Sequence, residues 1–318
     1  MKIDQPPWMP NILYRAIKEQ HASYDKGDSD FTVTELIRPA WQAALQRKHH
    51  EEIEEGADER IWSLFGSAIH SFIEKSAQEN DTTEKRLFIK RMGYKISGQM
   101  DHMEFQQYDH HWERNLYDWK VTSAYAGMND QPAKPEWGQQ LNLLKMLYDN
   151  QDSVNVNIHY ITNMYVIAFF RDWSENKYLQ DPASYPKHPY AQFQISPWST
   201  GDAEEFLVER IRLNLEADYQ VSGQKLSNHL LCNEQERWHK PDSWAAKSPG
   251  AKRAQKVFYS EKEASDWVNA KPLGKKTYDI EHRPGEDTRC MKYCNVNRFC
   301  THYKQLIKND NKQIKEAA

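Results

Sequence analysis

Apolar residues recur along this chain with two different periods. Over residues 60–77 they return every three or four positions, which is the spacing of one broad helical face. The apolar positions of this face are Ile61, Leu64, Phe65, Ile69, Phe72 and Ile73. We expect a helix here that buries this face.

Period-two alternation follows and predicts two strands, over residues 94–105 and 115–121. The polar loop between them is short enough for an antiparallel pair. A buried stretch over residues 156–173 predicts one or two further strands. Helical patterns cover residues 10–22, 32–45, 135–150 and 201–220, and the second of these opens with a capping box, Thr32 and Glu35. This order of elements predicts an α/β or α+β fold with a mixed central sheet flanked by helices.

Composition divides the chain further. After about residue 226 loops, basic residues and cysteines become frequent. We therefore expect a helical N-terminal segment over 1–59, a core over 60–226, a cysteine-bearing extension packed on that core over 227–306, and a frayed tail over 307–318.

Net charge limits the class of partner. The 318 residues carry a formal charge of −4, so nucleic acid contact would need a local patch rather than a generally basic surface. The N-terminus has no apolar signal region, and the longest apolar run, residues 165–170, is too short to span a membrane. We expect a cytoplasmic protein without a membrane partner, whose four cysteines are not in disulfides and are available to a metal.

Three polar signals occur in order along the core. They are Gly66, His70 and Glu74 at four-residue intervals on the first helix, Asp101 on the first strand, and Asp118 with Lys120 on one face of the second strand. Taken singly, the first signal is typical of a solvated helix pair, the second of a turn and the third of a solvated strand face. Together, two carboxylates and an imidazole suit Mg²⁺ or Mn²⁺, and such an ion assists hydrolysis by activating water and polarising a phosphoryl oxygen. A lysine beside a ligand would orient that water.

The ordered set resembles the RecB-like branch of the PD-(D/E)XK nuclease superfamily. "GSAIHSFIE", "GQMD" and "DWK" are similar to its first three motifs, and "QLNLL" resembles its Q-x-x-x-Y motif. Leu144 stands where that last motif has Tyr, and Tyr148 lies one turn further along. The resemblance covers roughly residues 60–150.

By this resemblance, the fold would be restriction-endonuclease-like and the protein would cleave DNA. The implied metal ligands are His70, Asp101, Asp118 and the Trp119 carbonyl. Lys120 would be the catalytic lysine. Glu74 and Gln140 would support the site or contact DNA.

The cysteines form a second candidate centre. Cys290, Cys294 and Cys300 are closely spaced, and Cys232 lies well upstream. Four such thiolates suit a 4Fe–4S cluster or a structural Zn²⁺, and spacing does not separate the two.

The resemblance favours the 4Fe–4S cluster. Iron–sulfur members of the branch end the nuclease domain with a cysteine trio, usually C-x₂-C-x₅-C, whereas the first gap here is x₃. Their first cysteine lies in a segment that resembles "TELIRPAW", where this chain has Arg38, so Cys232 would be the fourth ligand. The region from Cys232 to Cys294 also resembles bacteriophage-encoded members. Zn²⁺ stays the alternative.

The most basic stretch, residues 245–256, leaves two interpretations open. It carries Lys247, Lys252, Arg253 and Lys256 around a Gly-Pro turn. These residues would either contact DNA phosphates or belong to a solvated loop.

Taken together, the sequence and the resemblance predict a metal-dependent deoxyribonuclease. We expect an exonuclease that acts on linear DNA in phage replication or recombination, with phage recombination or single-strand-binding proteins as further partners. The alternatives are an endonuclease, a catalytically weak DNA-binding or docking module, and a zinc-stabilised interaction protein.

Overall fold

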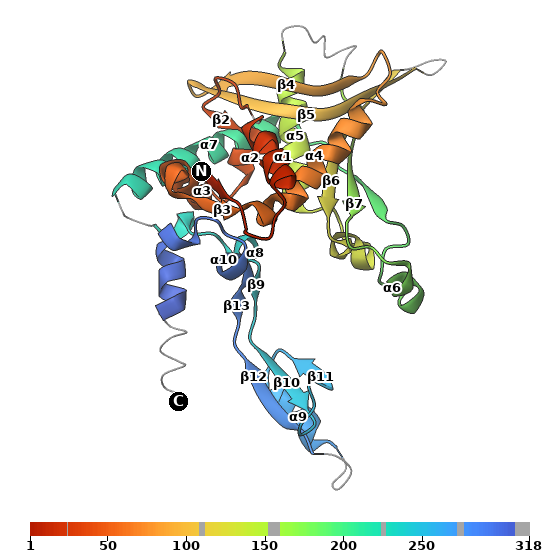
Figure 1. Ribbon diagram of the computed structural model, residues 1–318, viewed down its shortest axis with the longest axis vertical. Coiled ribbons are helices and arrows are strands. Elements are labelled where there is room, and N and C mark those ends of the chain that lie inside the picture. The colour runs from red at the N-terminus through yellow and green to blue at the C-terminus, as the bar shows by residue number, and fades with distance from the viewer. Residues whose placement is uncertain (24, 108–111, 152–159, 224–226, 272–276, 309–318) are drawn as a thin grey trace. The chain divides into compact units, whose positions relative to one another are not determined.

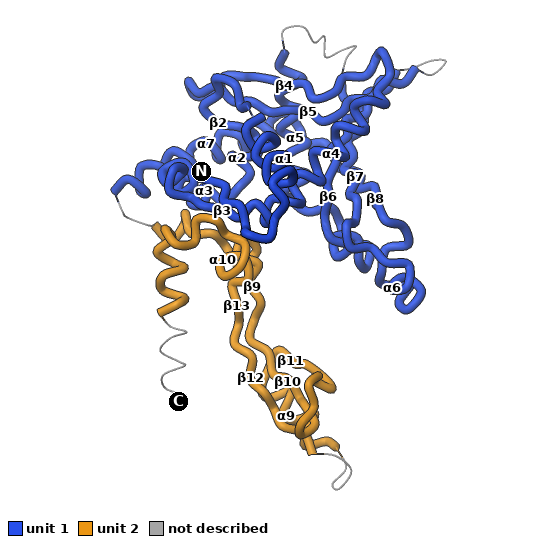
Figure 2. The backbone as a smooth tube through the Cα atoms, in the orientation of Figure 1, with its two compact units in different colours: residues 1–223 blue, residues 224–318 orange. Residues whose placement is uncertain are grey.

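The computed structural model describes residues 1–318 except 24, 108–111, 152–159, 224–226, 272–276 and 309–318 (Figure 1). The chain forms two compact units, residues 1–223 and 224–318 (Figure 2). The mixed α/β class is confirmed. The predicted change at residue 226 lies in a stretch outside the described residues, directly after the end of the first unit.

A six-stranded mixed sheet forms the centre of the first unit, with the order β2-β5-β6-β7-β8 and with β4 also paired to β5. Pairing is parallel for β2 with β5 and for β6 with β7, and antiparallel elsewhere. The strands are β2 (Phe31–Thr32), β4 (Thr82–Arg91), β5 (Tyr94–Gln107), β6 (Trp112–Thr122), β7 (Asn163–Phe170) and β8 (Tyr190–Gln194). The predicted strands over 94–105 and 115–121 are confirmed as β5 and β6, whereas β4 and β8 were not predicted.

The helices of the first unit lie mostly where the periodicity predicts them. They are α1 (Asn11–Ala22), α2 (Val33–Ile37), α3 (Ala40–Lys48), α4 (Ile61–Glu74), α5 (Pro135–Asp149), α6 (Glu175–Gln180) and α7 (Thr200–Gly223). The capping box of Thr32 and Glu35 is present at the start of α2. The single helix predicted over 32–45 is wrong, because Arg38 is extended before Pro39 and separates α2 from α3.

The sequence predicted a helical N-terminal segment over 1–59, but this segment also contains strands. Its strand β1 (Lys2–Asp4) pairs in parallel with β3 (Glu54–Gly56), and β2 joins the central sheet. The predicted frayed tail, residues 307–318, lies outside the described residues from residue 309 onward.

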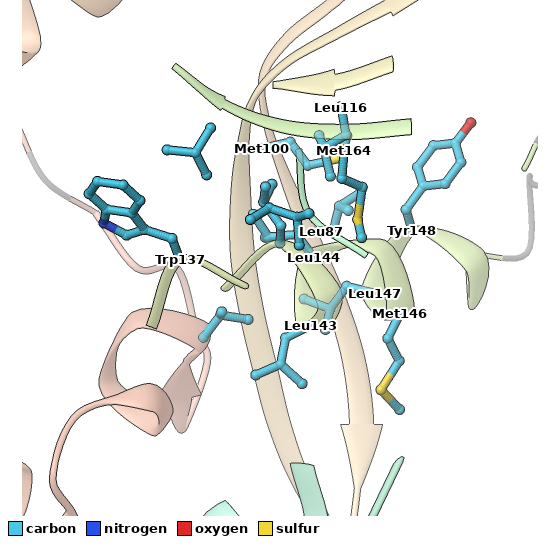
Figure 3. Packing of buried hydrophobic residues seen from close by; sticks show 14 of the residues in the cluster. Leu87, Met100, Leu116, Trp137, Leu143, Leu144, Met146, Leu147, Tyr148 and Met164 are labelled. Carbon is cyan, nitrogen blue, oxygen red and sulfur yellow. The ribbon is translucent and has the colours of Figure 1, made fainter. Parts of the chain in front are cut away.

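Helix α5 contributes much of the main core (Figure 3). Leu141, Leu143 and Leu147 of this helix are fully buried in the same cluster as Leu87 of β4 and Leu116 of β6. This packing fixes α5 against the sheet, because interiors at crystal-like density leave side chains little freedom to shift.

Helices α2 and α5 approach the sheet closely at Gly98 of β5. A Cβ atom built there would lie 2.6 Å from Leu144 Cδ2 and 2.9 Å from Val33 Cγ2. Only a residue without a side chain therefore lets α5 and α2 pack this closely on β5.

Gly98→Ala is expected to lower the free energy of unfolding by about 1–3 kcal/mol, because two buried side chains must move to admit the methyl group. Gly66→Ala is the matched control. No atom lies within 4 Å of its added Cβ, and alanine in a helix should raise stability by up to ~1 kcal/mol. Denaturant unfolding measures both, and equal stability of the two variants would contradict the proposed packing.

The predicted burial of the α4 face is wrong. Helix α4 forms over nearly the predicted range, but none of its residues is buried. Phe65 is 52% exposed and Phe72 is 70% exposed. Helical period shows that residues share a face, but not whether another element covers that face.

The second unit contains short strands and helices. They are α8 (Glu234–Arg237), β9 (His239–Lys240), β10 (Ser243–Lys247), β11 (Lys256–Phe258), α9 (Glu261–Asn269), β12 (Asp279–Arg283), β13 (Glu286–Asp287) and α10 (Thr288–Lys292). Strand β10 lies between β11 and β12, and β9 pairs with β13. Ala246, Phe258 and Ala264 form a small core between this sheet and α9. Across the described parts of both units, no helix has the length and apolarity needed to cross a membrane.

Candidate functional site

A break in the pairing along one edge of β5 creates the candidate site. Strand β4 pairs with β5 along one edge. The other edge is shared: β2 pairs with Ile96 and Ser97, and β6 pairs from His102 onward. Residues 98–101 thus have no strand partner on that edge within the described chain. Backbone and side-chain polar groups in such a gap must find partners other than a sheet ladder.

The strand register brings three carboxylates to the same level of the sheet, on the three neighbouring strands at this gap. Thr83 pairs with His102, so the next position, Glu84, lies across from Asp101. His102 also pairs with Tyr117 of β6, which sets Asp101 across from Asp118. Adjacent β4, β5 and β6 therefore each bring one acid to the same level of the sheet.

The Asp101 carboxylate bridges the gap. Its Oδ2 accepts a hydrogen bond from the Trp119 N–H at 2.9 Å, in place of a ladder bond. Asp118, which precedes Trp119 on β6, is only 1% exposed. The Lys120 ammonium donates to Asp118 Oδ1 at 2.9 Å and lies 2.8 Å from Oδ2. The acid and base on one face of β6 thus form an ion pair whose carboxylate is buried and whose ammonium is partly exposed.

His70 reaches the same point from α4. Its Nε2 lies 3.2 Å from the Trp119 carbonyl oxygen and 3.8 Å from Asp101 Oδ2. Its Nδ1 lies 3.2 Å from Glu84 Oε1, and Gln99 donates to Glu84 Oε2 at 2.6 Å. One atom each from His70, Glu84 and Asp101 can approach within 4.8 Å of the others, which is close enough for a shared ion.

A pocket of about 170 Å³ opens beside these groups. Its wall combines the cluster with residues from α2, β4 and α5; these lining residues are Thr32, Val33, Thr34, His70, Glu84, Arg86, Gly98, Gln99, Asp101, Gln140 and Leu144. Gln140 therefore lies at the site, as the sequence predicted. Leu144 presents an apolar wall where the resembled motif has Tyr. Tyr148 does not line the pocket; it is 5% exposed, and burial raises its pKa.

Crowding of the acids alters their protonation. Burial, together with the charge of Asp118, raises the pKa of Asp101 to about 7. Burial opposes the charged form of His70, but its hydrogen bond to Glu84 and the charge of Asp101 outweigh this and raise its pKa to about 9. For Lys120, the charges of Asp118 and Asp101 likewise outweigh burial and raise the pKa. At neutral pH, His70 and Lys120 are therefore cations facing clustered carboxylates.

The structure brings most of the predicted residues together, with one exception. His70, Asp101, Asp118, Lys120 and the Trp119 carbonyl all meet at the gap. Glu74 does not: it is exposed at the last position of α4 and lines neither the cluster nor the pocket. Glu84 occupies the place expected of Glu74, and sequence reasoning missed it.

The residues present fit a hard divalent cation. Carboxylate oxygens, an imidazole and a backbone carbonyl are suitable ligands for Mg²⁺ or Mn²⁺. Asp118 Oδ2 is buried without a hydrogen bond from any described residue, although the Lys120 ammonium is near. The cations His70 and Lys120 occupy space next to the same oxygens that an ion would bind.

Binding of Mn²⁺ is expected to strengthen as pH rises. A ligand imidazole must be neutral and a ligand carboxylate ionised, whereas metal-free His70 is protonated below about 9 and Asp101 below about 7. Binding should therefore release two protons below pH ~7, one between ~7 and ~9, and none above. Calorimetry in buffers of different ionisation enthalpy counts these protons. In His70→Gln the release below pH ~7 should fall from two protons to one, because only Asp101 still has a proton to lose; an unchanged release of two would exclude His70 as a ligand.

The four cysteines gather in the second unit. Burial is the main cause that raises the pKa of Cys232 to about 12, and the nearby thiols of Cys290, Cys294 and Cys300 add to it. Burial, with the charge of Asp287, raises the pKa of Cys290 to about 11. Without a metal, the thiols of Cys232 and Cys290 are thus neutral at pH 7. The set fits a thiolate-bound metal or cluster, whose binding would release protons.

Asp287 and His302, which sequence reasoning missed, flank this thiol group. Asp287 Oδ2 lies 2.8 Å from His302 Nε2 and 2.9 Å from Arg237 Nε, and its Oδ1 lies 2.7 Å from His239 Nδ1. One atom each from Asp287, His302 and Cys290 can lie within 4.8 Å of the others. The only sequence signal for this pair is proximity to the trio, in "EDTRC" and "CTHY".

The predicted basic segment forms the β10–β11 hairpin. Lys247 is already paired with Glu281 at 2.6 Å, and Lys256 lies 5.0 Å from the Phe258 ring centroid. Lys252 and Arg253 are exposed in the loop. Two of the four basic residues are therefore engaged within the unit, and the assignment of this segment to DNA contact stays a prediction.

Comparison with known proteins identifies no family. No family model and no curated protein matches the chain. Solved structures do match, among them one described as "Crystal structure of SSO0001". It is 16% identical, the match covers 64% of this chain and 84% of that chain, and the TM-score is 0.43. Likeness at this level carries no argument about function.

Proposed function

We propose that this chain is a metal-dependent deoxyribonuclease that hydrolyses phosphodiester bonds at the gap beside β5. The observation that carries the proposal is the convergence of Asp101, Asp118 and Lys120 with His70 and Glu84. These groups come from three strands and a helix, yet they meet beside one pocket. An ordinary solvated strand face would not bury Asp118 to 1% exposure.

Each residue has a role that its surroundings support. Asp101, Asp118, His70 and the Trp119 carbonyl would hold the ion, and Glu84 would orient His70 through Nδ1. A divalent ion supplies Lewis-acid chemistry: it polarises a phosphoryl oxygen and makes a coordinated water more acidic. Lys120 keeps its proton at neutral pH, so it acts as a fixed positive charge that orients water and stabilises developing negative charge. Gln140 in the pocket wall can donate to the substrate.

By the resemblance, the enzyme would be an exonuclease of phage replication or recombination. The test is cleavage of end-labelled linear DNA and closed circular DNA, single- and double-stranded, with Mg²⁺ or Mn²⁺ and with chelator. Metal-dependent loss of linear DNA alone supports the exonuclease, and cutting of circles supports an endonuclease. Absence of cleavage under every condition by correctly folded protein would overturn the proposal.

Lys120→Ala is expected to lower the cleavage rate by roughly 10²–10³-fold, since one preorganised charge is lost from the site. Lys145→Ala is the matched control, because Lys145 forms a similar ion pair with Asp149 at 2.5 Å away from the pocket. Single-turnover cleavage should separate the two variants. A Lys120→Ala enzyme as fast as Lys145→Ala would remove Lys120 from the chemistry.

One observation favours a second function, a DNA-binding or docking module with weak catalysis. Leu144 gives the pocket an apolar wall where the resembled motif has a polar Tyr. A protein that binds DNA in the presence of Mg²⁺ but never cleaves it would support this module.

We also propose that Cys232, Cys290, Cys294 and Cys300 hold a 4Fe–4S cluster, with structural Zn²⁺ as the alternative. The mutual electrostatic effect of the four thiols supports a common site. Anaerobically purified brown protein with iron and sulfide would support the cluster. Colourless protein with one zinc would support the alternative.

A further inference from the structure

Helix α4 carries a stripe of large apolar side chains, each of which stays about half exposed or more in the described chain. Trp62 is 48% exposed, Phe65 is 52% and Phe72 is 70%. Together with half-buried Ile69, they follow a three- and four-residue spacing, so they lie on one side of the helix. We call Trp62, Phe65 and Phe72 the α4 stripe. His70 projects from a different side of the same helix into the candidate site.

Positive charge lies over both ends of the α4 stripe. The Arg171 guanidinium is 4.6 Å from the Trp62 ring centroid, and the Lys75 ammonium is 5.5 Å from that of Phe72. Residues 61–73 contain no acid. This stretch is unusual in a chain whose net charge is −4, because an exposed helix normally mixes both signs.

The combination of exposed rings and cations favours one class of binding partner over another. An apolar protein surface would cover the rings but would also have to desolvate Arg171 and Lys75, which contact rings and for which the described residues provide no ion pair. A nucleic acid strand offers both complements: bases that stack on aromatic rings and phosphates that pair with cations. From Trp62 to Phe72 the helix rises ~15 Å, which is about four stacked nucleotides at 3.4 Å each.

We propose that an unpaired DNA strand lies along the α4 stripe, with bases against its rings and phosphates at Arg171 and Lys75. This inference rests on the proposed nuclease function and specifies the substrate as DNA with a single-stranded segment. Because α4 also supplies His70, a strand bound there is held by the helix that contributes to the metal-binding cluster.

The test measures binding of a fluorescent 12-nucleotide single strand without added Mg²⁺ or Mn²⁺, so that cleavage does not interfere and the metal proposed for the cysteines is retained. In the double variant Trp62→Ala/Phe72→Ala, Kd should rise roughly 10-fold or more. Phe72→Leu should weaken binding as much as Phe72→Ala, since leucine keeps apolar area but offers no ring to stack on. Lys75→Glu should also weaken binding and reduce its salt dependence.

Two controls lie outside the stripe. Tyr219→Ala removes a ring on α7 that is 81% exposed, and Lys177→Glu reverses an exposed charge on α6. Both should leave Kd within about twofold, the scatter expected of surface substitutions. Circular dichroism checks that each variant is folded, which is expected because the substituted side chains are exposed.

Two outcomes would overturn the inference. The first is an unchanged Kd in the double variant; if light scattering then shows a changed oligomeric state, the stripe is assigned to contact between copies. The second is full binding by Phe72→Leu, which would show apolar docking rather than stacking. Hydrolysis of bis(p-nitrophenyl) phosphate, too small to reach the stripe, tests the proposed nuclease separately.

Discussion

Asp118→Asn is expected to reduce metal-dependent DNA cleavage by on the order of 10³-fold or more while the protein stays folded. The substitution preserves the shape of the side chain but replaces one carboxylate oxygen with an amide nitrogen, which cannot ligate a cation. It also removes the charge that holds Lys120 in place and that raises the pKa of Asp101. Single-turnover cleavage of linear DNA and Mn²⁺ titration measure the two consequences.

Asp149→Asn is the matched control for this loss. Asp149 forms a half-buried ion pair with Lys145, away from the pocket. It should leave cleavage within about twofold of the unaltered protein. An active Asp118→Asn protein with normal Mn²⁺ affinity would show that Asp118 is not a metal ligand. The ordered motifs would then not indicate a metal site.

The parts of the site that sequence reasoning predicted are those that follow from local pattern. Alternation along β6 placed Asp118 and Lys120 on one face, and they form an ion pair. Helical period placed His70 on a side of α4 distinct from the apolar stripe. In each case the information lies within a few residues, where backbone geometry decides the direction of the side chain.

Glu84 was missed because its position depends on the pairing of two strands. Strand β4 carries charges at many positions, so its alternation is weak. The signal was the two-residue turn of Met92 and Gly93, with φ of 53° and 85°, which is typical of a tight hairpin. Such a turn fixes register, and counting back from it sets Glu84 across from Asp101.

Glu74 was chosen for the opposite reason. It continues the four-residue interval of Gly66 and His70, but it is the exposed last residue of α4 and does not line the pocket. Periodicity could not show where the gap in the sheet would open. That gap results from β2 and β6 sharing an edge of β5, and it depends on contacts between segments distant in the chain.

Loss of the metal or cluster proposed for the four cysteines is expected to unfold the cysteine-bearing part of the second unit and to leave the first unit folded. Few apolar side chains are buried in the described part of this unit: Leu230, Ala245, Ala246, Phe258, Ala264 and Val296. A core this small cannot offset the chain entropy of folding, so metal binding would supply the missing free energy, ~10 kcal/mol or more. Hydrogen exchange should show loss of protection in residues 228–240 and 286–300 after chelation or in Cys232→Ser.

Met291→Leu is the matched control, because it lies between Cys290 and Cys294 in the chain yet provides no ligand required by this centre. It should keep the metal and the exchange protection. If Cys232→Ser retains a full equivalent of metal, Cys232 is not a ligand. His302, which lies beside Cys290 and Asp287, would then be the candidate for the fourth position. If chelation leaves exchange in these segments unchanged, the hydrogen bonds that Asp287 accepts from His302 and His239 hold this part of the unit together without a metal.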